Sequence, residues 1–401
     1  MDTGKLRVII VGSGLAGLAA ARVLREKHHV TVYERGDQAV ATGGQGICIF
    51  PNGVKILEAH GYDRTRTKAV VQTGHRVYDK HGNMKSDEET DYRNQYGADT
   101  LAHMRIDLRD ELFRLATTRS EDLNIQGEPA KIIFQTAVTD MDPVRGEVTL
   151  GDGSSAEADV IIVADGIHSR LRSCIAGPEY FAKKMGLSCF RVAISVQDAK
   201  AALGWVPDWW DRPTGKGRGL VFEAGDGSNR FIVAYPLRNF EYMNLSCIFP
   251  TDPEQAKTST TATWYTEGDR SQLLEIFADF APDLIMLLRI ATQVKLWDLQ
   301  DLDPLPKWTL GKALLIGDAA HAMTPMQGQG ANMSIEDAGS LRLLLDPKIS
   351  RENVPSFLKQ IEAMRKPRAT QVLLDTRSIA ENFSLDAIAA KREHNFGPTQ
   401  A

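Results

Sequence analysis

The segment GDAAHAMTPMQGQGAN, from Gly317 to Asn332, places an aspartate and several glycines between an apolar run and a predicted helix. The run ALLIG, which ends at Gly317, is typical of a strand buried on both faces. A carboxylate at the tip of such a strand, here Asp318, can either cap a helix or bind a ligand at the edge of the sheet. The segment alone leaves both interpretations open.

Gly12, Gly14 and Gly17 form the pattern GxGxxG directly after the apolar run LRVIIV. Helix-forming residues follow, and HVTVYE then returns to strand character and ends at Glu34. In such a βαβ unit the glycines allow a tight turn, close approach to a pyrophosphate and packing of the helix on the strand. A carboxylate at the position of Glu34 can hold ribose hydroxyls. The unit predicts dinucleotide binding without choosing between NAD and FAD.

Asp165 is a third carboxylate at the end of a predicted buried strand, after Asp318 and Glu34. It lies in ADVIIVADGIHSRLR, where Gly166, Ser169 and Arg172 follow it. The carboxyl ends of parallel strands share one edge of a doubly wound sheet, and ligands bind at that edge. Asp165, the GxGxxG turn and the aspartate of the first segment are therefore expected to line one long cofactor.

These three segments, in this order and at this spacing, resemble those of the single-component FAD-dependent aromatic hydroxylases, of the salicylate hydroxylase and p-hydroxybenzoate hydroxylase type. The resemblance covers nearly the whole chain apart from its tail. It implies an α/β flavoprotein monooxygenase with a discontinuous Rossmann-like FAD-binding domain, a mostly antiparallel β-sheet substrate domain and C-terminal helices.

The resemblance also implies roles for single residues. Asp318 would bind the ribityl chain, Glu34 the adenosine ribose, and Arg105 the ribityl and phosphate region. Gly328 and Gly330 would let backbone amides and a helix N-terminus approach the flavin N1 and C2 carbonyl, where negative charge collects on reduction. The complete set of expected cofactor-binding residues is Gly12, Gly14, Leu15, Ala16, Gly17, Glu34, Arg35, Gly46, Arg105, Asp165, Asp318, Pro325, Gly328, Gly330, Ala331 and Asn332.

The resemblance further implies the reaction: NADH or NADPH reduces bound FAD, O2 adds to give a C4a-hydroperoxide, and one oxygen atom is transferred to an electron-rich carbon. A flavoenzyme that holds NAD(P)H in a separate Rossmann domain needs a second strand-GxGxxG-helix unit. GKGRG, from Gly215 to Gly219, has the wrong spacing for one. We therefore expect NAD(P)H to bind only transiently.

The expected substrate is an aromatic or indole-type small molecule. An arginine and a tyrosine on the substrate sheet would suit stabilisation of a phenolate, and Arg191 and Tyr235 are the candidate catalytic residues. A charge in mid-strand, as at Arg191, is costly unless it meets a ligand, a flavin or an acid. Tyr235 would bind or deprotonate a phenolic hydroxyl. Cys48 is interpreted as a buried small thiol, and His321 as structural rather than catalytic.

The composition excludes several classes of partner. The chain has 401 residues and a formal net charge of −5, with basic residues scattered, so nucleic acid and anionic membrane surfaces are not expected. The four cysteines show no CxxC pair and no histidine at ligand spacing, which predicts reduced thiols and no metal site. No targeting or membrane segment is evident, so a cytoplasmic location is expected. The protein is expected to be a monomer or a homodimer.

The elements are expected to divide as follows. The FAD-binding domain comprises residues 1–74, 98–184 and 294–345, the substrate-binding domain 75–97 and 185–293, and the C-terminal helical segment 346–401. Asp107 is the expected N-cap of a helix over 108–116. A hairpin is expected to turn at 81–83, and the tail from Val354 to form one long helix kinked at Pro367.

Two alternatives keep the same fold. The protein could epoxidise an alkene or an indole in secondary metabolism, or it could be a non-enzymatic binding protein of the GDI type that has lost its flavin. Flavin halogenases carry a WxWxIP signature that LGWVPDWWDR lacks. Reductases of isoprenoid chains would consume no oxygen in forming their product.

Overall fold

Two β-sheets organise the chain, whose computed structural model describes residues 4–38, 46–210, 214–251, 265–381, 383 and 385–396. The smaller of the two contains, in spatial order, β18 (Thr309–Leu310), β19 (Ala313–Leu315), β11 (Val160–Val163), β1 (Arg7–Val11), β2 (His29–Tyr33) and β7 (Lys131–Ile133). All neighbours are parallel except β18 and β19. The β-branched runs of its central strands are buried on both faces, as strands under helices on both sides require.

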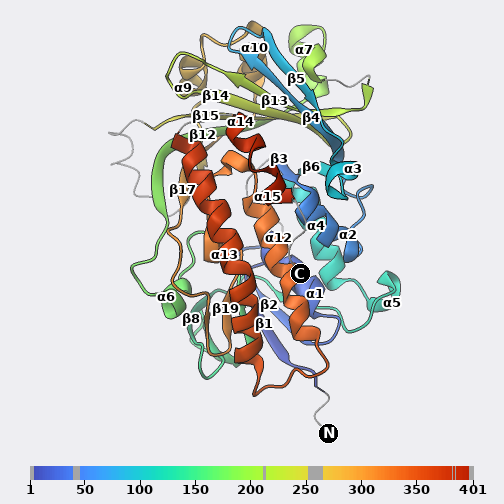
Figure 1. Ribbon diagram of the computed structural model, residues 1–401, viewed down its shortest axis with the longest axis vertical. Helices are drawn as coiled ribbons and strands as arrows, with labels where there is room; N and C mark the ends of the chain where they lie inside the picture. The colour runs from blue at the N-terminus through green and yellow to red at the C-terminus, as the bar shows by residue number, and fades with distance from the viewer. Residues whose placement is uncertain are drawn as a thin grey trace.

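The larger sheet lies at the other end of the molecule (Figure 1). It contains β16 (Tyr265–Glu267), β17 (Lys295–Asp301), β12 (Lys183–Ser195), β15 (Tyr242–Pro250), β14 (Phe231–Leu237), β13 (Gly217–Glu223), β4 (Val70–Asp79), β6 (Thr100–Met104) and β3 (Gly46–Ile49), with β5 (Met84–Glu89) paired to β4. β13 and β4 are parallel and the other pairings antiparallel. The predicted fold class is confirmed.

Helices cover both sheets. Those beside the smaller sheet are α1 (Leu15–Leu24), α2 (Pro51–Ala59), α4 (Arg105–Thr117), α12 (Gly330–Ser340) and α13 (Val354–Glu381). α7 (Val196–Leu203), α9 (Arg270–Ile276) and α10 (Pro282–Ile290) pack on the outer face of the larger sheet. Shorter helices are α3 (Tyr92–Tyr96), α5 (Ser120–Leu123), α6 (Arg172–Ala176), α11 (Asp318–His321), α14 (Leu385–Ala389) and α15 (Arg392–Phe396). The 3-10 helices of the described ranges include η1 (Asp208–Trp210), η3 (Pro325–Gln327) and η4 (Leu341–Leu345). A small separate sheet contains β8 (Val138–Asp142), β9 (Glu147–Leu150) and β10 (Ser155–Glu157).

Two local predictions are wrong. Helix α4 begins at Arg105, directly after β6, with Met104 as N-cap, so Asp107 lies in its first turn. Asp107 instead forms an ion pair with Arg238 at 2.6 Å. The tail is not one helix, because α13 ends at Glu381 and two short helices follow. The predicted hairpin between β4 and β5 is present.

No helix in the described ranges is both long and apolar enough to cross a membrane.

The glycine turn after β1 depends on close packing of α1. A Cβ atom on Gly17 would lie 2.0 Å from the carbonyl oxygen of Gly12. Gly12 itself has φ +100°, which favours glycine. A Cβ atom on Gly14 would meet nothing within 4 Å.

This contrast predicts different effects for two similar substitutions. Gly17→Ala should lower the free energy of unfolding by about 1–3 kcal/mol, because α1 must move away from the turn. Gly14→Ala should leave the stability of the FAD-free protein nearly unchanged. Urea unfolding of both variants measures the difference, and equal losses would contradict the packing described here.

Candidate active site

The three polar segments predicted from the sequence meet at one edge of the smaller sheet. β11 pairs with β1 on one side and with β19 on the other, so their carboxyl ends are neighbours. A Cβ atom on Gly12 would lie 2.5 Å from the carbonyl oxygen of Ala164, and one on Gly317 would lie 2.9 Å from the Cβ of Ala16. The structure therefore brings together the segments that were expected to line one cofactor.

Open space lies beside the glycines of this edge. Cβ atoms on Gly14 and Gly166 would meet no protein atom within 4 Å, and one on Gly330 would come no closer than 3.8 Å, to Met323. Because glycine has no side chain, the backbone at these positions stays uncovered. A phosphate group or a planar ring can therefore come close to it. The arrangement fits FAD.

Arg172 ties two of the segments together. Its Nε donates to the carbonyl oxygen of Ala319 at 2.7 Å, and its Nη2 donates to those of Ile167 at 2.8 Å and Asp318 at 3.2 Å. The side chain is buried. Arg172 thus has a structural role, because it holds together the two backbone segments that flank the site.

The carboxylate of Glu34 lies beside the glycine turn that follows β1. Its carboxylate accepts hydrogen bonds from the backbone N of Ser13 at 2.7 Å and from the backbone N of Gly36 at 2.8 Å. Arg109, a buried residue that the sequence interpretation missed, donates to the Ser13 hydroxyl at 3.4 Å. It lies one helical turn after Arg105, and that spacing on α4 was the available signal. Arg35 is exposed beside this turn.

Two carboxyl groups lie at the centre of the edge. Burial raises the pKa of both Asp165 and Asp318. Oδ1 of Asp165 has no hydrogen-bond partner among the described residues. Arg105 is close enough to Asp318 to lower the pKa of that carboxyl and offset part of the effect of burial. A ligand rich in hydroxyl groups would satisfy these acceptors.

The glycine-bearing turn is held by Asn332. Its Oδ1 accepts a hydrogen bond from the backbone N of Phe50 at 2.8 Å, and its Nδ2 donates to the carbonyl oxygen of Gly328 at 2.9 Å. Gly328 has φ +63°, and the turn includes Pro325 in η3. Asn332 therefore serves the shape of the turn, while Ala331 beside it is half-buried.

His321 takes a structural place, in agreement with its interpretation from sequence. It is 2% exposed, and its Nε2 lies 2.6 Å from Oδ2 of Asp337. The same carboxylate group accepts from the backbone N of Gly317 at 2.9 Å and from Nε of Arg365 at 3.0 Å. Although burial acts in the opposite direction, these neighbours lower the pKa of Asp337.

A polar stripe on the larger sheet faces this edge. In the strand register, Arg191 lies opposite Ser246, and Tyr235 lies opposite Asn244. The residues that alternate with them point into the apolar core under α7, α9 and α10. Ser246 and Asn244 were missed, although the alternation in MNLSCIF was a usable signal.

Arg191 is a charged group with unused hydrogen-bonding capacity. Its guanidinium lies 4.9 Å from the ring centroid of Trp297, and its Nε has no hydrogen-bond partner in the described part of the chain. Arg191 also acts electrostatically on Arg105 and on Tyr235, which places the three side chains near one another. The two candidate catalytic residues therefore lie together, beside a residue of the predicted cofactor set.

Strand β3 lies between the stripe and the glycine turn. A Cβ atom on Gly46 would lie 2.7 Å from Cγ of Asn244 and 2.8 Å from the ring of Tyr235. Burial raises the pKa of Tyr235 well above 10, so the phenol is protonated at neutral pH and can donate a hydrogen bond. Cys48, interpreted from the sequence as a buried thiol, is only half-buried. Desolvation raises its pKa to about 12, so the thiol is protonated at neutral pH.

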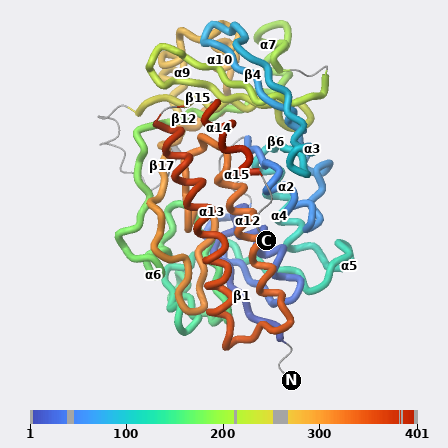
Figure 2. Tube along the Cα trace, viewed as in Figure 1, coloured from blue at the N-terminus to red at the C-terminus, as the bar shows by residue number. Residues whose placement is uncertain are grey.

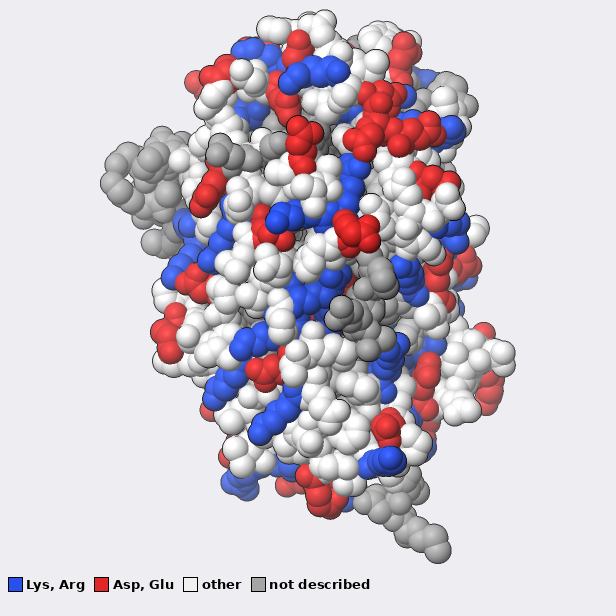
Figure 3. All heavy atoms as spheres, in the orientation of Figure 1, with Lys and Arg blue, Asp and Glu red and all other residues white. Residues whose placement is uncertain are grey.

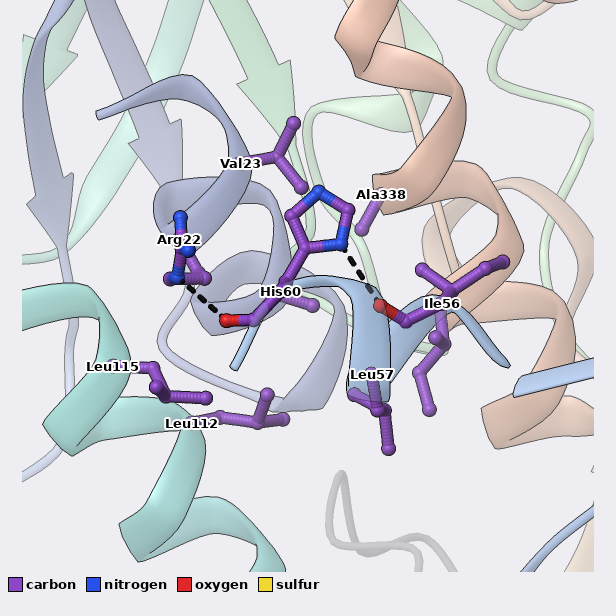
Figure 4. Close-up of a pocket in the computed structure, with 10 residues that line it drawn as sticks. Arg22, Val23, Ile56, Leu57, His60, Leu112, Leu115 and Ala338 are labelled. Atoms are coloured by element: carbon purple, nitrogen blue, oxygen red, sulfur yellow. Dashed lines mark hydrogen bonds between the residues drawn. The ribbon is translucent and has the colours of Figure 1, made fainter. Parts of the chain in front are cut away.

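Figure 4 shows a different space, an apolar gap of about 10 Å³ among α1, α2, α4 and α12. His60 lies at this gap, where its Nδ1 is 2.8 Å from the carbonyl oxygen of Ile56 and its own carbonyl oxygen accepts from Nε of Arg22. The gap is at most the size of one water molecule. It is a packing defect between helices and has no part in the proposed chemistry.

Replacing the buried carboxyl group of Asp318 should change both the stability of the protein and its affinity for FAD. Because burial raises its pKa, the ionised group opposes folding of the FAD-free protein at neutral pH. The FAD-free Asp318→Asn variant should be at least as stable as the wild type at neutral pH. This advantage should vanish as the pH falls toward the ordinary carboxyl pKa of 3.8. The affinity for FAD should fall about 10-fold or more, through loss of a charge-assisted hydrogen bond.

Thermal unfolding across pH and titration with FAD measure the two effects. Asp122→Asn, which removes an exposed ion pair with Arg119, is the matched control and should change stability by less than ~1 kcal/mol. A large loss of stability at neutral pH in FAD-free Asp318→Asn would assign a structural role to this carboxylate.

Comparison with known proteins identifies the family. The family described as FAD binding domain matches residues 5–376. The chain is 30% identical over 377 residues to hispidin-3-hydroxylase from Neonothopanus nambi, an alignment covering 92% of this chain and 87% of that protein. It is 28% identical over 411 residues to salicylate hydroxylase from Pseudomonas putida, covering 99% and 90%.

A solved structure shares the fold. CtdE in complex with FAD and substrate 4 superimposes with a TM-score of 0.77 at 21% identity, covering 94% of this chain and 89% of that one. Taken with the geometry of the strand ends, these similarities show that the chain belongs to the FAD binding domain family and is a flavoprotein monooxygenase of the aromatic hydroxylase type.

Proposed function

We propose that the protein uses NADH or NADPH and O2 to hydroxylate an electron-rich aromatic small molecule. When bound, FAD would supply electron transfer and oxygen activation, by way of the flavin C4a-hydroperoxide that the resemblance implies. The observation that carries the proposal is the position of the polar stripe beside the cofactor edge. A Cβ atom on Gly46 would contact Tyr235 and Asn244, and Arg191 is close enough to Arg105 to lower its pKa. The names of the relatives hispidin-3-hydroxylase and salicylate hydroxylase support an aromatic substrate.

The stripe would activate the substrate by stabilising its anion. A guanidinium in a partly buried site lowers the pKa of a nearby phenol more strongly than one in water. Arg191 would take this role, because its Nε has no partner in the described residues and Trp297 covers its guanidinium. Tyr235, protonated at neutral pH because burial raises its pKa, would donate a hydrogen bond to the same oxygen rather than remove a proton.

The expected division into domains is also part of the proposal. One apolar core is formed under the smaller sheet and a second under the larger sheet, in support of residues 1–74, 98–184 and 294–345 as one unit and 75–97 and 185–293 as another. Strands β3, β6 and β17 fall in the first set of ranges but pair within the larger sheet. The substrate would therefore bind where the chain crosses between the two units.

The first test is an absorption spectrum of the purified protein, followed by NADH and NADPH oxidation with a panel of phenols, indoles and anthranilates. A yellow protein whose oxidation rate rises with one phenol, and whose product carries one atom from ¹⁸O2 on the ring, would support the proposal. Epoxide product from an alkene or indole would favour the epoxidase alternative. A yellow protein that transfers oxygen to no member of the panel would contradict the proposed substrate class.

Substitutions in the stripe give a sharper prediction. Arg191→Met should reduce kcat/KM for a phenol by about 100-fold, because the phenolate loses its charged partner in a partly buried site. The loss should shrink as the pH rises toward the pKa of the free phenol, since less stabilisation is then needed. Tyr235→Phe should lose about 10-fold.

Lys216→Ala, at an exposed ion pair with Glu89 in the same sheet, is the control and should retain full activity. Steady-state kinetics across pH check these expectations. A loss in Arg191→Met that is constant with pH would contradict the role in phenolate stabilisation.

A further inference from the structure

The last described helix, α15, folds back onto the region that connects α11 with α12. Figures 1 and 2 show the chain leaving the end of α13 through α14 and returning toward α2 and α12. Arg368, in the middle of α13, donates hydrogen bonds to the carbonyl oxygens of His394 at 2.7 Å and Asn395 at 3.0 Å. We name the residues Arg392–Phe396 the C-terminal clasp.

The clasp binds the turn of the candidate active site through one amide pair. Asn395 is 2% exposed, and its Nδ2 donates to Oε1 of Gln327 at 2.8 Å. Nε2 of Gln327 donates in turn to Oγ1 of Thr376 at 2.9 Å and to the carbonyl oxygen of Val372 at 3.3 Å. Both ends of the Gln327 amide are thus held from the C-terminal region, and Gly328 follows directly with its positive φ.

An aromatic stack supports the same turn from a second direction. Phe396, 4% exposed, stacks on Phe50 with 4.8 Å between ring centroids and an interplanar angle of 12°. Its ring also meets Tyr92 and Tyr96 edge-on. A Cβ atom on Gly328 would lie 2.9 Å from the ring of Phe50. Phe50 therefore contacts both the clasp and the glycine turn.

The clasp also contacts the larger sheet. Arg392 forms an ion pair with Glu88 on β5 at 2.6 Å, and its Nη2 lies 3.1 Å from Nδ1 of His75 on β4. Figure 3 shows acidic and basic side chains interspersed over the face that carries α13. Five residues at the end of the described chain thus join α13, the glycine turn and the substrate sheet.

We propose that Asn395 is a positioning residue that holds the turn Pro325–Gly328 against the flavin and so directs oxygen into the substrate. This inference rests on the proposed function. In the coupled reaction, NAD(P)H, H⁺, O2 and Ar–H give NAD(P)⁺, Ar–OH and H2O. In the uncoupled one, NAD(P)H, H⁺ and O2 give NAD(P)⁺ and H2O2. A loosened turn admits water to the site and favours the second reaction.

The test variant is Asn395→Leu, in which the side chain keeps the branched skeleton of asparagine and loses its hydrogen bonds. With the phenol that most stimulates NAD(P)H oxidation, the ratio of H2O2 to hydroxylated product should rise about 3- to 10-fold, as expected for loss of one buried hydrogen bond. KM for that phenol should stay within about 2-fold of the wild-type value, because the variant leaves the polar stripe intact. A structural role alone would lower the thermal midpoint and leave the product ratio unchanged.

Further variants distinguish the effect of the Asn395–Gln327 hydrogen bond from that of a general change in the helix. Glu393→Ala changes an exposed side chain in the same helix and should behave as the wild type. Gln327→Leu should raise the ratio at least as much as Asn395→Leu, because it also removes the hydrogen bonds to Thr376 and Val372. The double variant should be no worse than Gln327→Leu alone, because the two residues share one interaction. The proposal is overturned by an unchanged ratio in Asn395→Leu, by an equal rise in Glu393→Ala, or by additive effects in the double variant.

A measurement on the FAD-bound protein without substrate distinguishes the proposed role of Asn395 from the proposed function. The visible circular dichroism of bound FAD should change, and FAD should dissociate faster, in Asn395→Leu but not in Glu393→Ala. If these changes occur while the wild type hydroxylates no aromatic compound, the proposed function fails and the positioning of the turn stands. If the wild type hydroxylates a phenol and Asn395→Leu alters neither the FAD signals nor the product ratio, the clasp proposal fails alone.

Discussion

Two adjacent carboxylates buried in α12, those of Glu336 and Asp337, set the arrangement on which the rest of the site depends. Arg365 donates to both, and Arg368 donates to Glu336 at 2.7 Å. Asp337 also accepts from the backbone of Gly317, at the start of the aspartate-bearing turn. Removing one partner from such a buried cluster leaves an uncompensated charge, which costs about 3–5 kcal/mol. The cluster therefore fixes α12 against α13 and against the end of β19.

Glu336 is linked to the C-terminal clasp through Arg368. Arg368, bound to Glu336, is the residue that also holds the carbonyl oxygens of His394 and Asn395. Asn52 at the start of α2 donates to Glu336 as well. The turn that would face the flavin is thus enclosed by helices joined through one buried network. Because buried charges must keep their partners, motion in any one of these elements is opposed by the others.

The candidate active site contains buried polar groups that the protein itself leaves without a partner. Oδ1 of Asp165, Nε of Arg191 and Oδ1 of Asn244 lack hydrogen-bond partners among the described residues, and burial raises the pKa of Asp165 and Asp318. Such groups destabilise the protein in the absence of a ligand. At the cofactor edge and on the polar stripe, these groups give up stability that a bound ligand would restore, the usual trade-off at a functional site.

Local rules in the sequence determined much of this protein. The glycines of GSGLAG, the apolar runs before Asp165 and Asp318, and the hairpin between β4 and β5 all follow from interactions within a few residues. The N-cap predicted at Asp107 failed because β6 runs directly into α4 and because Arg238, distant in sequence, pairs with that carboxylate. Tertiary structure alone decided which distant groups meet: Asn395 and Gln327 are 68 residues apart, and neither stands out in the sequence. Spacing predicts contacts along one strand or one helix, whereas contacts between elements depend on how the whole chain packs.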